Sequence, residues 1–238
     1  MKNSVKHCSA NLWVRFYILL LLFWMGSNPV WAQTTAATQL DITNPFTERK
    51  IGRDIAVFED SSGQLTFDQV RAAETAAKFV QSSKDSPNFG YTHSAYWARF
   101  SLNDVRTAQD TNHRADLILL LAYAQTDFAE LRCTNAAGTT ILQHRAGDHV
   151  PRAEWPSSYR EPAFKITPDA TDCWLRVQTS ASMQFPLTLY SEKAFVEMRL
   201  SDNALQALYF GALLVMLAYN GLIAITTRSM AYTSYTVF

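Results

Sequence analysis

Aromatic, basic and acidic side chains in the middle of the chain are the groups best suited to binding a small ligand. Flat aromatic rings stack on the apolar faces of sugars, while Arg and Asp side chains form hydrogen bonds with hydroxyl groups. The candidates are Tyr91, Trp97, Arg99, Asp148, Trp155 and Arg160. Two of them have a simpler alternative, because Trp97 could cover a sheet and Arg99 could pair with a carboxylate. The residue types therefore favour a site for a carbohydrate or another small molecule, with packing as the alternative.

Residues for catalysis or metal binding do not form any recognisable motif. The sequence contains no Gly-x-Ser-x-Gly, no Gly-x-x-x-x-Gly-Lys-Ser/Thr and no His-Glu-x-x-His. The histidines His93, His113, His144 and His149 are scattered. We expect no catalytic residue, no metal ion and no cofactor. The two carboxylates of a glycosidase cannot be tested by spacing alone.

The cysteines can form at most one disulfide in an exported chain. Cys8 lies in an N-terminal segment that we expect to be removed, which leaves Cys133 and Cys173. In an oxidising compartment such a pair can form a bond. Closing a loop of about 40 residues would stabilise the fold by roughly 3 to 4 kcal/mol. The alternative is a pair of buried free thiols.

The N-terminus has the features of a secretory signal peptide. Basic residues precede the apolar run 16–25, which is too short to cross a membrane as a helix. Residues 30–32, Val-Trp-Ala, then provide small side chains at the spacing that signal peptidase requires. We predict a signal peptide over residues 1–32 and a linker over residues 33–40. An uncleaved signal anchor is the alternative.

The charge of the chain argues against a nucleic-acid partner. The full sequence has 21 Lys and Arg against 21 Asp and Glu. Loss of Lys2, Lys6 and Arg15 with the signal peptide leaves 18 basic residues against 21 acidic ones. No run of Lys or Arg occurs, whereas a nucleic-acid binder needs a concentrated basic patch. We therefore exclude DNA and RNA as partners.

The segment 204–227 has the length and composition of a transmembrane helix. It contains no charged residue, and about 20 apolar residues suffice to cross a bilayer. Residues 196–203 would connect it to the preceding domain. Residues 228–238 would form a cytoplasmic turn and the start of a second, truncated transmembrane helix. Small residues such as Gly211 and the polar Asn220 favour a helix with neighbours, with an isolated anchor as the alternative.

The stretch 41–195 reads as one extracytoplasmic domain that is mainly β. Short runs of β-type residues alternate with turn residues at spacings near ten, which predicts a two-sheet jelly-roll β-sandwich. The predicted strands are 53–59, 95–103, 116–124, 127–133, 139–145, 161–167, 172–179 and 183–190. The alternation of apolar and polar side chains predicts one solvent-exposed face for strands such as 95–103. Segment 116–124 is apolar throughout, so we place it centrally with both faces buried.

The predicted strands are joined by turns, one helix and two long loops. Residues 135–138 predict a hairpin loop. Thr66 can cap a short helix over residues 66–80, with an irregular excursion as the alternative. Residues 81–94 and 146–160 have the composition of long loops. Ligand contacts are often made by such loops.

Several motifs in a fixed order indicate a resemblance to a known family. They are Asn88-Phe89-Gly90-Tyr91, Tyr96-Trp97-Ala98-Arg99-Phe100, Trp174-Leu175-Arg176-Val177-Gln178, Pro186-Leu187-Thr188-Leu189 and the helix from Gly211 to Asn220. Over roughly residues 41 to 238, this order resembles the type-2 extracellular domain of bacterial seven-transmembrane receptors with diverse intracellular signalling modules. The resemblance implies a jelly-roll domain similar to carbohydrate-binding modules, then seven membrane helices and a cytoplasmic output such as a diguanylate cyclase or histidine kinase. It does not account for the paired cysteines.

The resulting prediction is a periplasmic ligand-sensing domain of a receptor in the bacterial inner membrane. A ligand-dependent change would pass to transmembrane helices and to a cytoplasmic signalling module that this sequence does not contain. A homodimer is one assembly that such a receptor could form. The ligand must bind two states of the receptor with different affinity. One alternative is a scaffold that docks a partner protein through an apolar patch around Trp97 or Trp155. Another is a membrane-anchored carbohydrate-active enzyme.

Overall fold

The computed structural model describes residues 39–41, 47–103, 116–228, 231 and 234. The predicted signal peptide and most of the predicted linker lie outside these residues. The described elements are β1 (Gln39–Asp41), β2 (Glu48–Lys50), β3 (Ala56–Asp60), α2 (Phe67–Arg71), α3 (Ala73–Ala76), β4 (Val80–Gln81), β5 (Asn88–Tyr91), β6 (Ala95–Asn103), β7 (Leu117–Leu121), β8 (Phe128–Thr134), β9 (Thr140–Ala146), η1 (Arg152–Glu154), β10 (Ala163–Ile166), β11 (Asp172–Gln178), β12 (Ser182–Gln184), β13 (Leu187–Ser191) and α4 (Glu192–Thr227).

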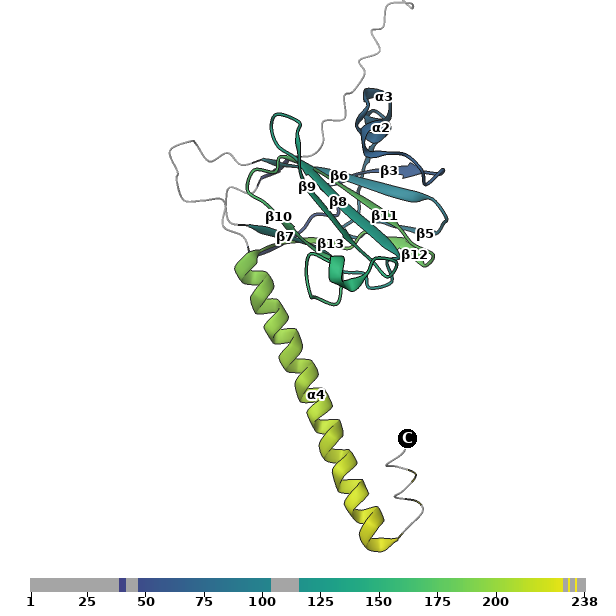
Figure 1. Cartoon of the computed structure of the whole chain (residues 1–238), viewed down its shortest axis with the longest axis vertical. Helices are drawn as coiled ribbons and strands as arrows, with labels where there is room; N and C mark the ends of the chain where they lie inside the picture. Colours follow the sequence, from purple (N-terminus) through teal and green to yellow (C-terminus); the bar gives the residue numbers. More distant parts are fainter. Residues whose placement is uncertain (1–38, 42–46, 104–115, 229–230, 232–233, 235–238) are drawn as a thin grey trace, which may run out of the picture. The chain divides into compact units, whose positions relative to one another are not determined.

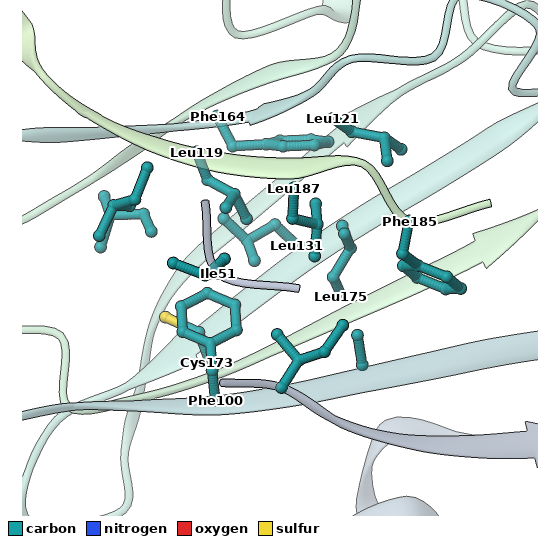
Figure 2. Packing of buried hydrophobic residues seen from close by; sticks show 14 of the residues in the cluster. Ile51, Phe100, Leu119, Leu121, Leu131, Phe164, Cys173, Leu175, Phe185 and Leu187 are labelled. Atoms are coloured by element: carbon teal, nitrogen blue, oxygen red, sulfur yellow. The ribbon is translucent and has the colours of Figure 1, made fainter. Parts of the chain in front are cut away.

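Two sheets enclose the main core. The larger sheet has the order β4-β3-β6-β11-β8-β9, with β1 also paired to β6, and the smaller sheet has the order β10-β7-β13-β2. Figure 1 shows the two sheets one above the other. Phe100 and Leu175 of the larger sheet belong to the same buried cluster as Leu119 and Phe164 of the smaller one (Figure 2). The predicted fold class, mainly β with a C-terminal apolar helix, is therefore confirmed, while the jelly-roll connectivity stays a prediction.

Strand β7 lies inside the smaller sheet, and both of its faces are buried as predicted. It pairs with β10 on one side and with β13 on the other. Its odd-numbered leucines, including Leu119, point into the main core. Ile118 and Leu120 belong to a second cluster that includes Phe195 of α4. An apolar residue at every position of this strand is needed because protein covers it on both sides.

The larger sheet is also covered on its outer face, so the prediction of one wet face per strand is wrong at its centre. Trp97 of β6 and Trp174 of β11 are 2% and 6% exposed. They pack in a separate cluster with Phe67 and Val70 of α2. The ring of Phe67 meets that of Trp174 edge-on at a centroid distance of 5.3 Å. Helix α2 thus covers the outer face of the larger sheet with apolar side chains, and the alternation of residues within a strand does not indicate such a cover.

The predicted helix over residues 66–80 forms two short helices. Thr66 begins α2 with a capping box, in which its side chain accepts a hydrogen bond from the Gln69 backbone and the Gln69 side chain accepts one from the Thr66 backbone. Ala72 then adopts an extended conformation with ψ 144° and separates α2 from α3. The capping signal was therefore correct, but the helix is shorter than predicted.

Of two predicted loops, one is present in the structure and the other contains a strand. Residues 135–138 form the hairpin loop between β8 and β9, with Gly138 at φ 76°. Residues 81–94, predicted as one long loop, instead contain β5, which pairs with β12. The predicted strand 183–190 is divided into β12 and β13 around Pro186, because proline has no N–H for a sheet hydrogen bond.

Cys133 of β8 and Cys173 of β11 lie directly opposite each other in the antiparallel register, and their sulfur atoms are bonded. Their Cα atoms are 4.1 Å apart, and both residues are fully buried in the main core. The bond therefore joins two central strands of the larger sheet.

The C-terminal helix α4 is continuous from the β domain to Thr227. Ser191 caps it by accepting a hydrogen bond from the Ala194 backbone at 3.3 Å. Residues 196–203, which the sequence analysis assigns to a connector, belong to this helix. Among the described residues, α4 is the helix long and apolar enough to cross a membrane, and it contains the predicted span 204–227.

Gly52 occupies a position that no larger residue can fill. A Cβ atom built there would lie 1.9 Å from the Asp85 carbonyl oxygen, so the backbone would have to move. We expect Gly52→Ala to destabilise the domain by about 3 kcal/mol in urea unfolding. Gly90→Ala is the control: nothing lies within 4 Å of its Cβ and only the φ of 73° is unfavourable, so the loss should be about 1 kcal/mol. Equal losses in both variants would contradict the steric explanation.

Candidate functional site

Three of the six predicted ligand residues, Asp148, Trp155 and Arg160, line one cavity of about 520 Å³. We call it the η1 cavity, because the 3-10 helix η1 and its flanking residues form it. Its lining residues are Gly147, Asp148, His149, Val150, Pro151, Arg152, Trp155 and Arg160. Its volume lies in the range of small-molecule sites. The predicted loop 146–160 therefore does enclose a space of suitable size.

The η1 cavity is built by contacts within its own segment. Trp155 donates a hydrogen bond from Nε1 to the Val150 carbonyl oxygen at 3.1 Å. The Arg152 guanidinium stacks 3.9 Å from the centroid of the Trp155 ring. It also donates hydrogen bonds to the carbonyl oxygens of Ser158 and Tyr159. Because Arg152 stacks on the ring of Trp155, a sugar could stack on that side only by displacing Arg152.

The polar groups of the η1 cavity are better placed for a ligand than the indole. Asp148 is exposed, and its carboxylate can accept hydrogen bonds from hydroxyl or ammonium groups. The side chain of Arg160 is 51% exposed and can donate to hydroxyl, carboxylate or phosphate oxygens. The cavity can therefore bind a small polar molecule through one acceptor and one cationic donor.

The same segment is bonded to α4 through a group that we call the Asp202 cluster, consisting of Tyr159, Arg160 and Asp202. Arg160 Nη2 lies 2.9 Å from Asp202 Oδ2. The Tyr159 hydroxyl donates a hydrogen bond to the same oxygen at 2.9 Å. The Tyr159 ring also packs against Phe195 of α4, with a centroid distance of 5.5 Å. Arg160 is thus shared between the cavity and the helix.

Burial raises the pKa of two side chains in this segment, Tyr159 and Glu161. Burial, reinforced by the hydrogen bond to Asp202, raises the pKa of Tyr159 to about 12. The phenol therefore remains a hydrogen-bond donor at neutral pH. Burial also raises the pKa of the neighbouring Glu161, while the Arg160 guanidinium opposes this increase. Arg160 lies between two carboxylates, with its Nε 3.7 Å from Glu161.

Another cavity of about 520 Å³, here called the β5 groove, lies between β3, β4 and β5. Phe89 stacks on Tyr96 there, at a centroid distance of 4.5 Å. Burial and the nearby Glu59 charge raise the pKa of Tyr96 to about 12. Lys78 and Lys84 also line the groove. None of the six predicted ligand residues lines this groove, although Phe89 and Tyr96 belong to the sequence motifs Asn88-Phe89-Gly90-Tyr91 and Tyr96-Trp97-Ala98-Arg99-Phe100.

The other three predicted ligand residues lie apart from the η1 cavity. Tyr91 is 86% exposed on β5. Trp97 is buried under α2, which favours its packing role and removes the apolar surface patch that a docking scaffold would need there. Arg99 lines a smaller cavity. Its Nη2 lies 3.5 Å from Oδ1 of Asp172, which agrees with the alternative prediction that Arg99 pairs with a carboxylate.

No group of three or more His, Cys, Asp or Glu side chains that could hold a metal ion occurs within the described residues. His113 lies outside them. His144, on β9, has a pKa lowered by burial, and His149 lines the η1 cavity. His93 and His149 together line a further cavity, from which His144 is absent.

A family model described as 7TMR-DISM extracellular 2 matches residues 52–191. No curated protein matches the chain. The matched region contains the η1 cavity and the β5 groove and ends with Ser191, the residue that caps α4.

Proposed function

The chain belongs to the family of 7TMR-DISM extracellular 2 domains, and from this membership we propose that it is the periplasmic ligand-sensing part of a membrane receptor. In this proposal residues 1–32 direct export, and α4 is the first helix to cross the bacterial inner membrane. Further transmembrane helices and a cytoplasmic signalling module follow in the full-length receptor. A homodimer that meets through α4 is compatible with its exposed apolar surface.

The observation that carries this proposal is the shared position of Arg160. Its guanidinium lines the η1 cavity and also binds Asp202 on α4. A ligand that takes hydrogen bonds from Arg160 competes with Asp202 for the same donors. Ligand binding therefore favours the state in which the contact between the cavity segment and α4 is weakened. This difference in affinity between two states is what a sensor requires.

The ligand class that best fits the η1 cavity is a small polar molecule, with carbohydrates as the class that the family resemblance favours. Asp148 and Arg160 can bind hydroxyl groups from two directions. A ligand with an acidic group would compete with Asp202 more strongly, because hydrogen bonds between guanidinium and a charged oxygen are stronger than those to hydroxyls.

Asp202→Asn tests the connection to α4 in the full-length receptor. The amide keeps a carbonyl oxygen for the Tyr159 hydroxyl but loses the ion pair with Arg160. This ion pair is partly exposed, so its loss is worth about 0.5 to 1 kcal/mol. We expect the basal output of the cytoplasmic module to shift about two- to fivefold toward the ligand-bound level.

Glu197→Gln is the matched control for Asp202→Asn. Glu197 lies on the same helix, pairs with Lys193 and does not line the η1 cavity. Its output should equal that of the wild type. If Asp202→Asn also behaved as the wild type in output and in hydrogen exchange of residues 152–160, the proposed connection through Asp202 would be wrong.

A further inference from the structure

A smaller cavity of about 250 Å³ lies on the outer face of the larger sheet, where α2, α3 and the β8–β9 hairpin meet. We call it the Arg99 pocket. The residues that matter for its chemistry are Arg71, Arg99, Asn135, Gly138, Asp172 and Trp174. It shares no lining residue with the η1 cavity or the β5 groove.

Two guanidinium groups of this pocket lie against one aromatic ring. The Cζ atoms of Arg71 and Arg99 are 5.7 Å and 5.3 Å from the centroid of the Trp174 ring. Arg99 and Trp174 are directly opposed on β6 and β11, so the sheet register fixes this arrangement. Asp172 supplies one carboxylate, which leaves the charged lining of the pocket with an excess of one positive charge.

The donors of Arg99 are poorly satisfied by the protein. Its Nε is shielded from solvent and has no hydrogen-bond partner among the residues that the structure describes. Its Nη2 lies 3.5 Å from Asp172 Oδ1, which is too long for a good hydrogen bond. That oxygen already accepts a hydrogen bond from the Ser101 hydroxyl. Buried N–H groups in proteins nearly always have an acceptor, and the Nε of Arg99 is an exception among the described residues.

Arg71 is held in place while still contributing charge. Its Nη2 donates a hydrogen bond to the Gly138 carbonyl oxygen at 3.0 Å, which ties α2 to the hairpin. The same side chain lines the pocket and brings its positive charge to it. A small anion in the pocket would therefore meet the positive charge of both guanidinium groups and the weakly paired Nη2 of Arg99.

We propose that the Arg99 pocket binds a small oxyanion, a carboxylate or phosphate group held by Arg99 and Arg71 beside Trp174. Guanidinium groups bind both kinds of oxyanion through paired, charge-assisted hydrogen bonds. A volume of about 250 Å³ admits inorganic phosphate or a short organic acid. The inference does not depend on the proposed signalling role, because binding is measured directly on this chain.

The test is a calorimetric titration of the full chain in a neutral detergent at constant ionic strength. Inorganic phosphate, acetate and succinate are the probes, and chloride is the control. Tryptophan fluorescence provides a second readout, since Trp174 borders the pocket. We expect saturable binding of phosphate or of the carboxylates. The probe that binds saturably identifies the kind of oxyanion.

Three variants locate the binding. Arg99→Gln should weaken it at least tenfold. Asp172→Asn should tighten it, because the competing carboxylate is removed. Arg145→Gln should leave it unchanged, since Arg145 lies on β9 of the same sheet, pairs with Glu130 and does not line the pocket.

Three results would overturn the proposal. They are the absence of saturable binding for every probe, equal binding by Arg99→Gln and the wild type, and weaker binding by Asp172→Asn. If Arg99→Gln fails to fold, Asp172→Asn and the wild-type fluorescence titration still decide between binding and its absence. Loss of signalling in the receptor would not bear on this result.

Discussion

Replacing Trp97 by alanine is expected to destabilise the domain by about 4 kcal/mol. The indole is 2% exposed and packs between the larger sheet and α2, beside Phe67 and Trp174. Its removal leaves a cavity that the surrounding side chains can fill only partly. The α2 residues Phe67 and Val70 belong to the same cluster, so the packing of this helix should be weakened as well. Urea unfolding followed by circular dichroism measures the loss.

Tyr91→Ala is the matched comparison for Trp97→Ala. Both residues were predicted ligand contacts, but Tyr91 is 86% exposed. Its replacement should change the free energy of unfolding by less than about 0.5 kcal/mol. A Trp97→Ala protein as stable as Tyr91→Ala would show that the indole is not packed in the way described, and would restore Trp97 as a candidate for surface contact.

Removal of the Cys133–Cys173 bond is the second large effect that we expect. The bond closes a loop with a sequence separation of 40, which in the loop-entropy model corresponds to about 4 kcal/mol of stability. Cys133→Ala combined with Cys173→Ala should lower the urea midpoint accordingly. Both side chains are buried in the core, so the double variant also loses a small amount of packing.

A reductant provides the control for the cysteine experiment. It should destabilise the wild type under unfolding conditions and have no further effect on the double variant. If it left the unfolding of the wild type unchanged, the two residues would be free thiols in the protein, which is the alternative that the sequence left open.

Much of the strand pattern could be predicted where a local signal was strong. The run 95–103 coincides with β6, and the apolar run 116–124 contains β7. Strand β5 was missed because Asn88-Phe89-Gly90-Tyr91 contains glycine and asparagine, which resemble turn residues in isolation. Its pairing with β12, more than 90 residues later, is a tertiary contact that propensity does not register.

The candidate site was predictable only where its parts are close in sequence. Asp148, Trp155 and Arg160 meet because one loop carries them all. The bond from Arg160 to Asp202 joins residues far apart in the chain, and no local pattern indicates it. The β5 groove was missed for the same reason, since Glu59 and Phe89 reach it from different strands.

The uninterrupted course of α4 has a consequence for the orientation of its apolar C-terminal portion. Successive residues of an α-helix are rotated by about 100°, so Asn220 lies within about 20° of the direction of Phe195, 25 residues earlier. Phe195 is fixed against the smaller sheet by Tyr159 and Tyr190. The packing of Phe195 therefore fixes the side of α4 on which the polar amide of Asn220 lies, and a rotation of the helix about its axis at Phe195 would turn that amide by the same angle.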